Sequence, residues 1–76
     1  MTERFVPSEK DIGVMKAGIT ICFAEEYNKS LRETVELFQA NGIFEYLDKF
    51  ADQFINKTFP YMASFISDRL AASGSA

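Results

Sequence analysis

Few residues in this chain carry side chains that could do chemistry. The sequence contains no histidine and no tryptophan, and its single cysteine is Cys22. A cysteine nucleophile needs a base to take its proton, and no histidine is present to serve. Cys22 also lies inside a long apolar stretch, where a cysteine is usually a small core residue. The sequence therefore predicts that Cys22 packs and does not react.

Two groups of carboxylates remain as candidates for chemistry. Glu25 and Glu26 are adjacent, so on a helix they point in different directions and do not form the opposed pair that glycoside hydrolysis needs. Glu45, Asp48 and Asp52 share one helix face, as ligands of a hard cation could, but no calcium-binding loop accompanies them.

A solvated acidic face, partly paired with Lys49, is the interpretation that this second group favours. A zinc site built from soft ligands is excluded because the chain has no histidine and one cysteine. We therefore expect no enzyme activity, no metal and no cofactor.

The charge of the chain narrows the classes of partner. A formal charge of −3 and a pI near 4.8 argue against a protein that binds the phosphate backbone of nucleic acid or docks on an anionic membrane. The longest apolar stretch, residues 12–24, is interrupted by Lys16 and is shorter than the roughly 20 residues of a membrane span. A lone cysteine fits a reducing compartment. We expect a cytoplasmic protein that binds no nucleic acid and no membrane.

The hydrophobic pattern predicts an all-α fold. Apolar residues recur with the helical period, and no second strand is present to pair with the β-branched run at residues 19–23. We expect a single compact four-helix domain spanning residues 1–76, with frayed ends at 1–6 and 73–76. Its helices are expected near residues 8–28, 30–41, 43–56 and 60–72.

Local signals mark where these helices begin and end. Ser8 with Asp11, and Ser30 with Glu33, have the spacing of capping boxes. Gly42 follows the second helix, where a left-handed glycine commonly ends a helix. The first helix is apolar on nearly every side, which is typical of a buried helix. We expect it to be central.

Three short segments match a pattern that recurs elsewhere. They are residues 23–27 (Phe-Ala-Glu-Glu-Tyr), residues 36–38 (Glu-Leu-Phe) and residues 42–47 (Gly-Ile-Phe-Glu-Tyr-Leu), followed by Phe50. In this order they resemble a family of short bacterial helical proteins catalogued only as a domain of unknown function. The match covers residues 23–54, with a shorter connection after Tyr27 and without the later Leu-His-Thr stretch of that family. The resemblance implies an all-helical fold, a cytosolic bacterial setting and a gene beside that of a larger partner.

Aromatic residues on the last two predicted helices form the most promising constellation. The apolar half of the helix at 43–56 is too wide for one neighbour in so small a domain, so its margin is a candidate binding surface. The residues that we expect there are Phe44, Tyr46, Phe50, Tyr61, Met62 and Phe65. A stripe of small residues on the first helix, comprising Gly13, Ala17 and Ala24, is the second choice for such a surface.

These observations predict a non-enzymatic protein–protein interaction module. It would act as a homodimer or as the small partner, adaptor-like or antitoxin-like, of a larger protein. The alternative is a small helical regulator that binds nucleic acid or holds a hydrophobic ligand in its Phe-rich core.

Overall fold

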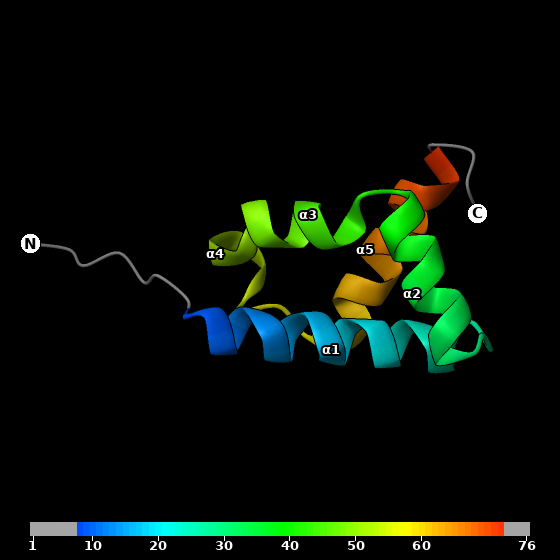
Figure 1. Cartoon of the computed structure of the whole chain (residues 1–76), viewed down its shortest axis with the longest axis horizontal. Helices are drawn as coiled ribbons and strands as arrows, with labels where there is room; N and C mark the ends of the chain where they lie inside the picture. The colour runs from blue at the N-terminus through cyan, green and yellow to red at the C-terminus, as the bar shows by residue number, and fades with distance from the viewer. Residues whose placement is uncertain (1–7, 73–76) are drawn as a thin grey trace, which may run out of the picture.

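The computed structural model describes residues 8–72, and this part of the chain contains five helices and no strand (Figure 1). The predicted all-α fold is confirmed. The frayed ends predicted at 1–6 and 73–76 lie outside the described residues. The helices are α1 (Glu9–Glu26), α2 (Leu31–Ala40), α3 (Ile43–Lys49), α4 (Ala51–Phe54) and α5 (Phe59–Ala72).

Both predicted capping boxes are present. At the start of α1, the Ser8 hydroxyl accepts from the Asp11 backbone N–H at 3.2 Å, and the Asp11 carboxylate accepts from the Ser8 N–H at 3.3 Å. At the start of α2, Ser30 and Glu33 exchange the same two bonds, each 3.0 Å long. Each box satisfies backbone N–H groups that have no partner inside the helix.

Left-handed residues end the first two helices. Gly42 has φ +64°, as predicted for a glycine that stops α2. At the end of α1, Asn28 has φ +53°, and the next N–H, that of Lys29, donates back to the Ala24 carbonyl at 2.8 Å. Asparagine tolerates this conformation better than most residues, so Asn28 takes the role that glycine has at Gly42.

The helix predicted at 43–56 is broken at Phe50. Its φ of −112° and ψ of 24° depart from helical values, and α4 follows as a short separate turn. No proline or glycine causes the break. The bend instead brings the ring of Phe54 to 5.5 Å from the ring of Tyr46 and 5.6 Å from that of Phe65, so ring packing across α3, α4 and α5 holds the chain in this bend.

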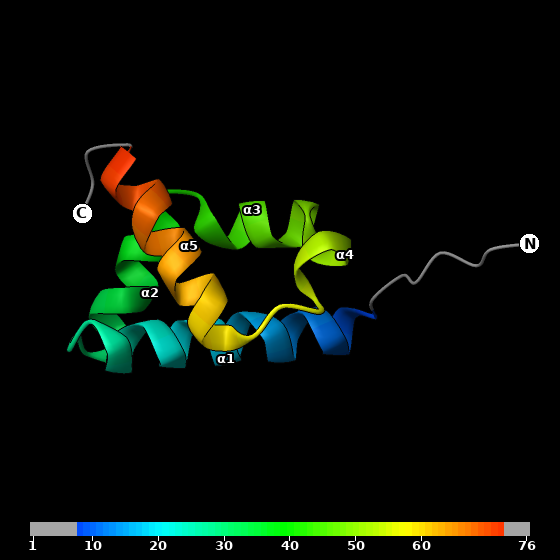
Figure 2. The same cartoon turned by 180° about the vertical axis from the view of Figure 1, so that it is seen from behind.

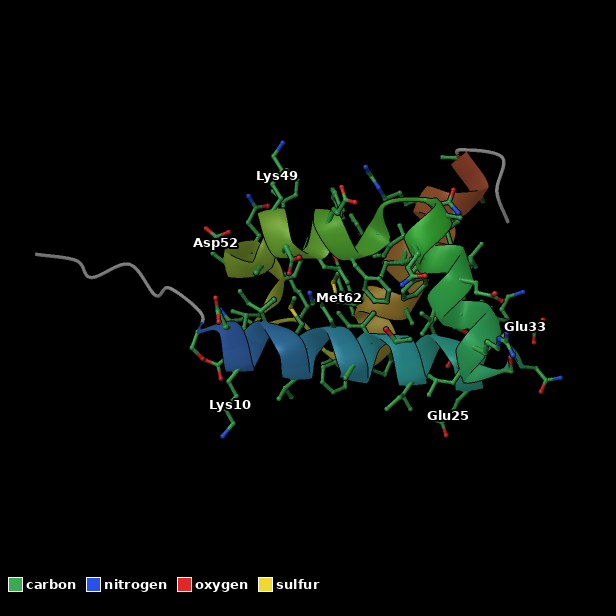
Figure 3. The ribbon with its side chains drawn as sticks, in the orientation of Figure 1. Lys10, Glu25, Glu33, Lys49, Asp52 and Met62 are labelled. Atoms are coloured by element: carbon green, nitrogen blue, oxygen red, sulfur yellow. The ribbon has the colours of Figure 1, made fainter. Side chains whose placement is uncertain are left out.

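The helices are arranged around α1. Helix α3 runs along one side of it, α2 closes one end, and α5 crosses behind, as the reverse view shows (Figures 1 and 2). The most extensive contact between helices is that of α1 with α5. The core lies between them, with Met62 near its middle (Figure 3). Its buried apolar residues are Met15, Ile19, Phe23, Phe38, Ile43, Leu47, Ala51, Phe54, Met62, Ala63, Ile66 and Leu70.

A glycine allows α5 to begin close to α1. The ring of Phe59 occupies the space where a Cβ atom on Gly18 would lie, so any larger residue at Gly18 would displace that ring. Thr58 caps the start of α5, since its hydroxyl accepts from the Tyr61 N–H at 3.2 Å. The chain therefore turns from α4 into α5 directly on the surface of α1.

We predict that Gly42→Val destabilises the fold by about 1–2 kcal/mol, because a β-branched residue resists the left-handed conformation. The space around Gly42 is open, so the cost is one of backbone conformation alone. Urea denaturation measures it. Gly13→Ala is the matched control, since Gly13 is an exposed helical glycine with equally open surroundings, and it should stabilise by about 0.5–1 kcal/mol. Equal effects at the two positions would contradict the backbone argument.

The capping box of α2 should make stability depend on pH. The Ser30 backbone N–H and then the Ser30 hydroxyl hold the pKa of the Glu33 carboxyl below its usual value. A carboxyl with a lowered folded-state pKa stabilises the fold above its unfolded-state pKa, and that contribution is lost as pH falls through the folded-state value. The difference in unfolding free energy between wild type and Glu33→Gln should therefore shrink on acidification. A difference that stays constant with pH would exclude this role for Glu33.

Candidate interaction surface

The geometry around Cys22 makes it a poor nucleophile. Its side chain is half-buried on α1. Burial raises the pKa of the thiol, and the negative charges of Glu26 and Glu25 raise it further. Less thiolate is therefore present at neutral pH than in a free cysteine.

The acidic face predicted on α3 and α4 forms an ion pair with α1. Asp48 pairs with Lys16 of α1, with 2.9 Å between Nζ and Oδ1, and this replaces the expected pairing with Lys49. The Lys49 ammonium instead lies 5.6 Å from the centre of the Phe50 ring. Among residues 8–72, no group of three or more acidic, cysteine or histidine side chains is placed to hold a metal ion.

Three of the predicted interface residues pack on one another. The rings of Tyr46 and Phe65 are nearly parallel, with centroids 6.4 Å apart, and Phe50 lies 5.0 Å from Tyr46. The guanidinium of Arg69 covers the Tyr46 ring at 3.9 Å. Much of this aromatic surface is therefore used to join α3, α4 and α5 within the chain.

The other three predicted residues lie in separate places. Met62 is 0% exposed, so it belongs to the core and its placement on a surface was wrong. The reason is that α5 turns Met62, Ala63 and Ile66 toward α1. Tyr61 is 53% exposed, and Lys57 lies over its ring at 5.5 Å. Phe44 is half-buried, and its ring contacts that of Phe38 at 5.5 Å.

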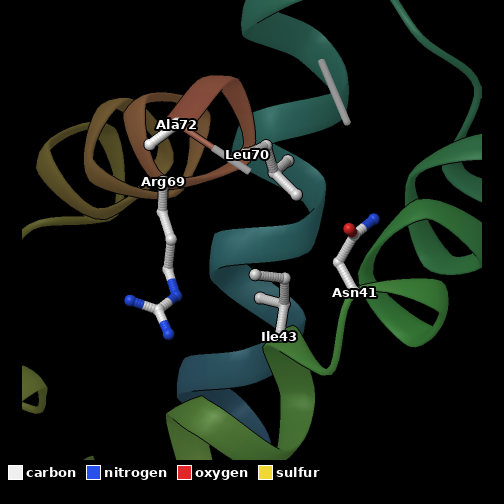
Figure 4. Close-up of a pocket in the computed structure, with 5 residues that line it drawn as sticks. All are labelled: Asn41, Ile43, Arg69, Leu70 and Ala72. Atoms are coloured by element: carbon white, nitrogen blue, oxygen red, sulfur yellow. The ribbon is translucent and has the colours of Figure 1, made fainter. Parts of the chain in front are cut away.

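A small hollow lies where the ends of α2 and α5 meet. It has a volume of about 340 Å³. The close-up shows Arg69 extending along its opening while Leu70 and Ile43 form its wall (Figure 4). Both of these apolar residues are buried core side chains, and Arg69 is already engaged with Tyr46. This hollow therefore offers little free contact surface.

An apolar groove lies on another side, between α1, α2 and the start of α3. It has a volume of about 410 Å³ and is lined by Ala17, Thr20, Ile21, Leu31, Val35 and Phe44, with Lys16 at its edge. The Thr20 hydroxyl donates to the Lys16 carbonyl at 2.6 Å, so it presents mainly its methyl group. We call this feature the α1–α2 groove. Phe44, a predicted site residue, is part of it.

The outer side of α1 continues the apolar surface of this groove. Val14 is 59% exposed, Ile21 is 49% exposed, and Ala17 lies exposed between them. Leu31 at the start of α2 is 52% exposed beside the groove. We call Val14, Ala17 and Ile21 the α1 outer face. Together with Leu31, they form a patch of apolar side chains that no other part of residues 8–72 covers.

The sequence indicated only part of this surface. Because α1 is apolar on nearly every side, its pattern predicts a buried helix and does not show which side faces outward. The stripe of small residues, our second choice for a binding surface, predicted part of it. Ala17 belongs to the α1 outer face and Gly13 is exposed, whereas Ala24 is buried.

Comparison of the chain with models of known protein families, with curated protein sequences and with solved structures finds no match. The resemblance of residues 23–54 to the bacterial helical family therefore stays a prediction. Within residues 8–72, no helix has both the length and the apolar character to cross a membrane.

The raised pKa of Cys22 predicts slow thiol chemistry. At pH 8, an aromatic disulfide reagent should react with Cys22 more slowly than with free cysteine, and the midpoint of the pH–rate curve should lie above the ordinary thiol pKa. Glu26→Gln removes one source of the shift and should speed the reaction modestly, whereas Glu33→Gln, on α2, should not. Reaction faster than free cysteine would show that Cys22 is an activated thiol.

Proposed function

We propose that this protein is a non-enzymatic protein–protein interaction module, and that the α1 outer face with the α1–α2 groove is its binding surface. The observation that supports this most directly is the exposure of Val14 and Ile21 on one side of α1, together with the exposure of Leu31, which lines the same groove as Ile21. Scattered apolar residues on a protein surface need no explanation, but a contiguous patch on two helices and over a groove is typical of an interaction site.

The energetics favour covering this patch. Full burial of a Val, Leu or Ile side chain is worth about 1.5–3 kcal/mol relative to full exposure, and these three side chains are each about half exposed. A partner that covers them would therefore gain several kcal/mol before the costs of association. In the folded single chain, the half of each side chain that is still exposed contributes nothing to the free energy of burial.

The remaining features of the chain suit a binding protein. The thiol of Cys22 is unpaired and half-buried, which fits a reducing compartment such as the cytoplasm. The acidic charge favours a protein partner over a nucleic acid. The partner in this proposal is a second copy of the chain or a larger protein of which this chain is the small companion.

A ligand held in the Phe-rich core has less support. The rings of Phe23, Phe38 and Phe44 contact one another with centroids 5.0 and 5.5 Å apart, so they fill the space between α1, α2 and α3. An apolar molecule would have to lie in the α1–α2 groove, on the surface. The interaction module explains both the groove and the exposed residues outside it.

Variants on the proposed surface test this function. Ile21→Glu and Leu31→Glu should each weaken association at least tenfold, because a charge would be buried at the interface. Tyr61→Glu is the matched control, since Tyr61 is an equally exposed apolar residue on α5, outside the surface. Sedimentation of the purified chain measures self-association, and affinity capture with the same variants measures binding of other proteins. If Ile21→Glu behaves as wild type in both, the proposed function is wrong.

A further inference from the structure

The α1 outer face has opposite charges at its two ends. Lys10 lies in the first turn of α1 and Glu25 in the last, and both are exposed. They point away from the body of the molecule on the same side of the helix (Figure 3). Within residues 8–72, no ion pair involves either of them. Both charges are therefore free to meet a partner.

These charges lie on one line with the apolar residues between them. Lys10, Val14, Ala17, Ile21 and Glu25 are separated by steps of three or four residues, which keeps them on the same side of a helix. At about 1.5 Å per residue, the line is roughly 22 Å long. It forms a charged end, an apolar middle and an oppositely charged end.

The line is symmetric about a point between Ala17 and Gly18. Val14 and Ile21 lie equally far from this point on either side, and so do Lys10 and Glu25. A two-fold axis through this point would bring Val14 of one copy opposite Ile21 of the other. It would also place Lys10 of each copy opposite Glu25 of the other, so that one rotation satisfies both kinds of contact.

The geometry points to a homodimer in which the α1 helices of two copies lie antiparallel across this axis, an inference that rests on the proposed function and names its partner. The exposed Ala17 at the centre suits the crossing, because its small side chain lets two helix backbones approach closely, whereas the neighbouring Gly18 is covered by the Phe59 ring. The α1–α2 groove lies beside Ile21, so Val14 of the second copy enters at its edge.

The charges select the antiparallel arrangement over a parallel one. In a parallel pair about a two-fold axis, Lys10 would face Lys10 and Glu25 would face Glu25, which is repulsive at both ends. In the antiparallel pair, two attractive contacts form. Charges beside an apolar helix seam set partner orientation in this way in coiled coils.

The size of the interface sets a further condition. A specific dimer buries about 600 Å² or more on each copy. The α1 outer face is a narrow strip, so side chains on both of its flanks must also be covered. Leu31 lies on one flank and Phe59, packed on Gly18, on the other, and both are exposed. These two residues would widen the interface on both flanks of the strip.

Charge exchange on the full chain tests the arrangement. Sedimentation equilibrium would compare wild type with Lys10→Glu, Glu25→Lys and the double variant. Each single variant turns two attractions into two repulsions and should raise the dimer Kd about tenfold at low salt. The double variant should return it to near the wild-type value. High salt should reduce these differences.

One of these variants separates the specific contact from overall charge. Glu25→Lys makes the chain two charges more positive than its −3, so general repulsion between copies should fall. The proposed contact instead predicts weaker association. Glu36→Lys is the matched control, because Glu36 is exposed on α2 outside this surface and its change in net charge is the same. Lys10, Glu25 and Glu36 are all exposed, and circular dichroism checks that each variant is folded.

The outcomes distinguish this inference from the proposed function. A wild-type chain that stays monomeric at about 100 µM, or a dimer that the single charge variants do not weaken, overturns the antiparallel homodimer. If Ile21→Glu still abolishes such a dimer, or abolishes binding of another protein, the interaction surface stands and only its occupant or register is wrong. Weakening by both single variants with recovery in the double variant supports the inference.

Discussion

The packing of α5 against α1 is the contact on which the other helices depend. It is the most extensive contact between helices, and it is possible because Gly18 leaves room for the ring of Phe59 where α5 begins. From that point α5 turns Met62, Ala63 and Ile66 into the core, while α2 and α3 contact α1 from other directions. Together these helices cover the side of α1 that carries Met15, Ile19 and Phe23. A chain of 76 residues has no further helix in its described part to cover the opposite side, so Val14 and Ile21 remain exposed.

The side-chain hydrogen bonds of the helices are made to backbone groups three or four residues away. The capping boxes pair each serine with an acidic residue three positions later. The buried hydroxyls of Thr20 and Thr34 donate to carbonyls one turn earlier. Among the described residues, no buried side-chain polar atom lacks a hydrogen-bond partner. The unfavourable contact with water that remains in this fold is therefore that of exposed apolar surface. Burial of this surface against another molecule would remove it.

Features that depend on a few neighbouring residues could be predicted from the sequence, and features that depend on packing could not. The capping boxes and the left-handed Gly42 involve residues within one turn, so their spacing was sufficient. The break at Phe50 has no local signal, because it depends on the positions that Tyr46 and Phe65 take in the folded chain. The location of the candidate surface also depends on packing, and so it could be predicted only in part. Aromatic residues at helical spacing indicated a surface, but stacking of Phe65 on Tyr46 uses much of it, and an all-apolar α1 gave no sign of which side faces outward.

The residue types on the α1 outer face suit the proposed association better than they suit an exposed helix surface. At an exposed position within a helix, Ala, Glu or Lys favours the helix more than a β-branched residue does, because Val and Ile lose side-chain freedom there. Val14 and Ile21 therefore add nothing to α1 through helix propensity, and half of each side chain remains in contact with water. Their stiffness becomes an advantage when the face is buried, since few side-chain conformations remain to be lost on binding. In the proposed homodimer, the two β-branched residues on either side of Ala17 and Gly18 would therefore contribute binding energy, whereas in the single chain they contribute little.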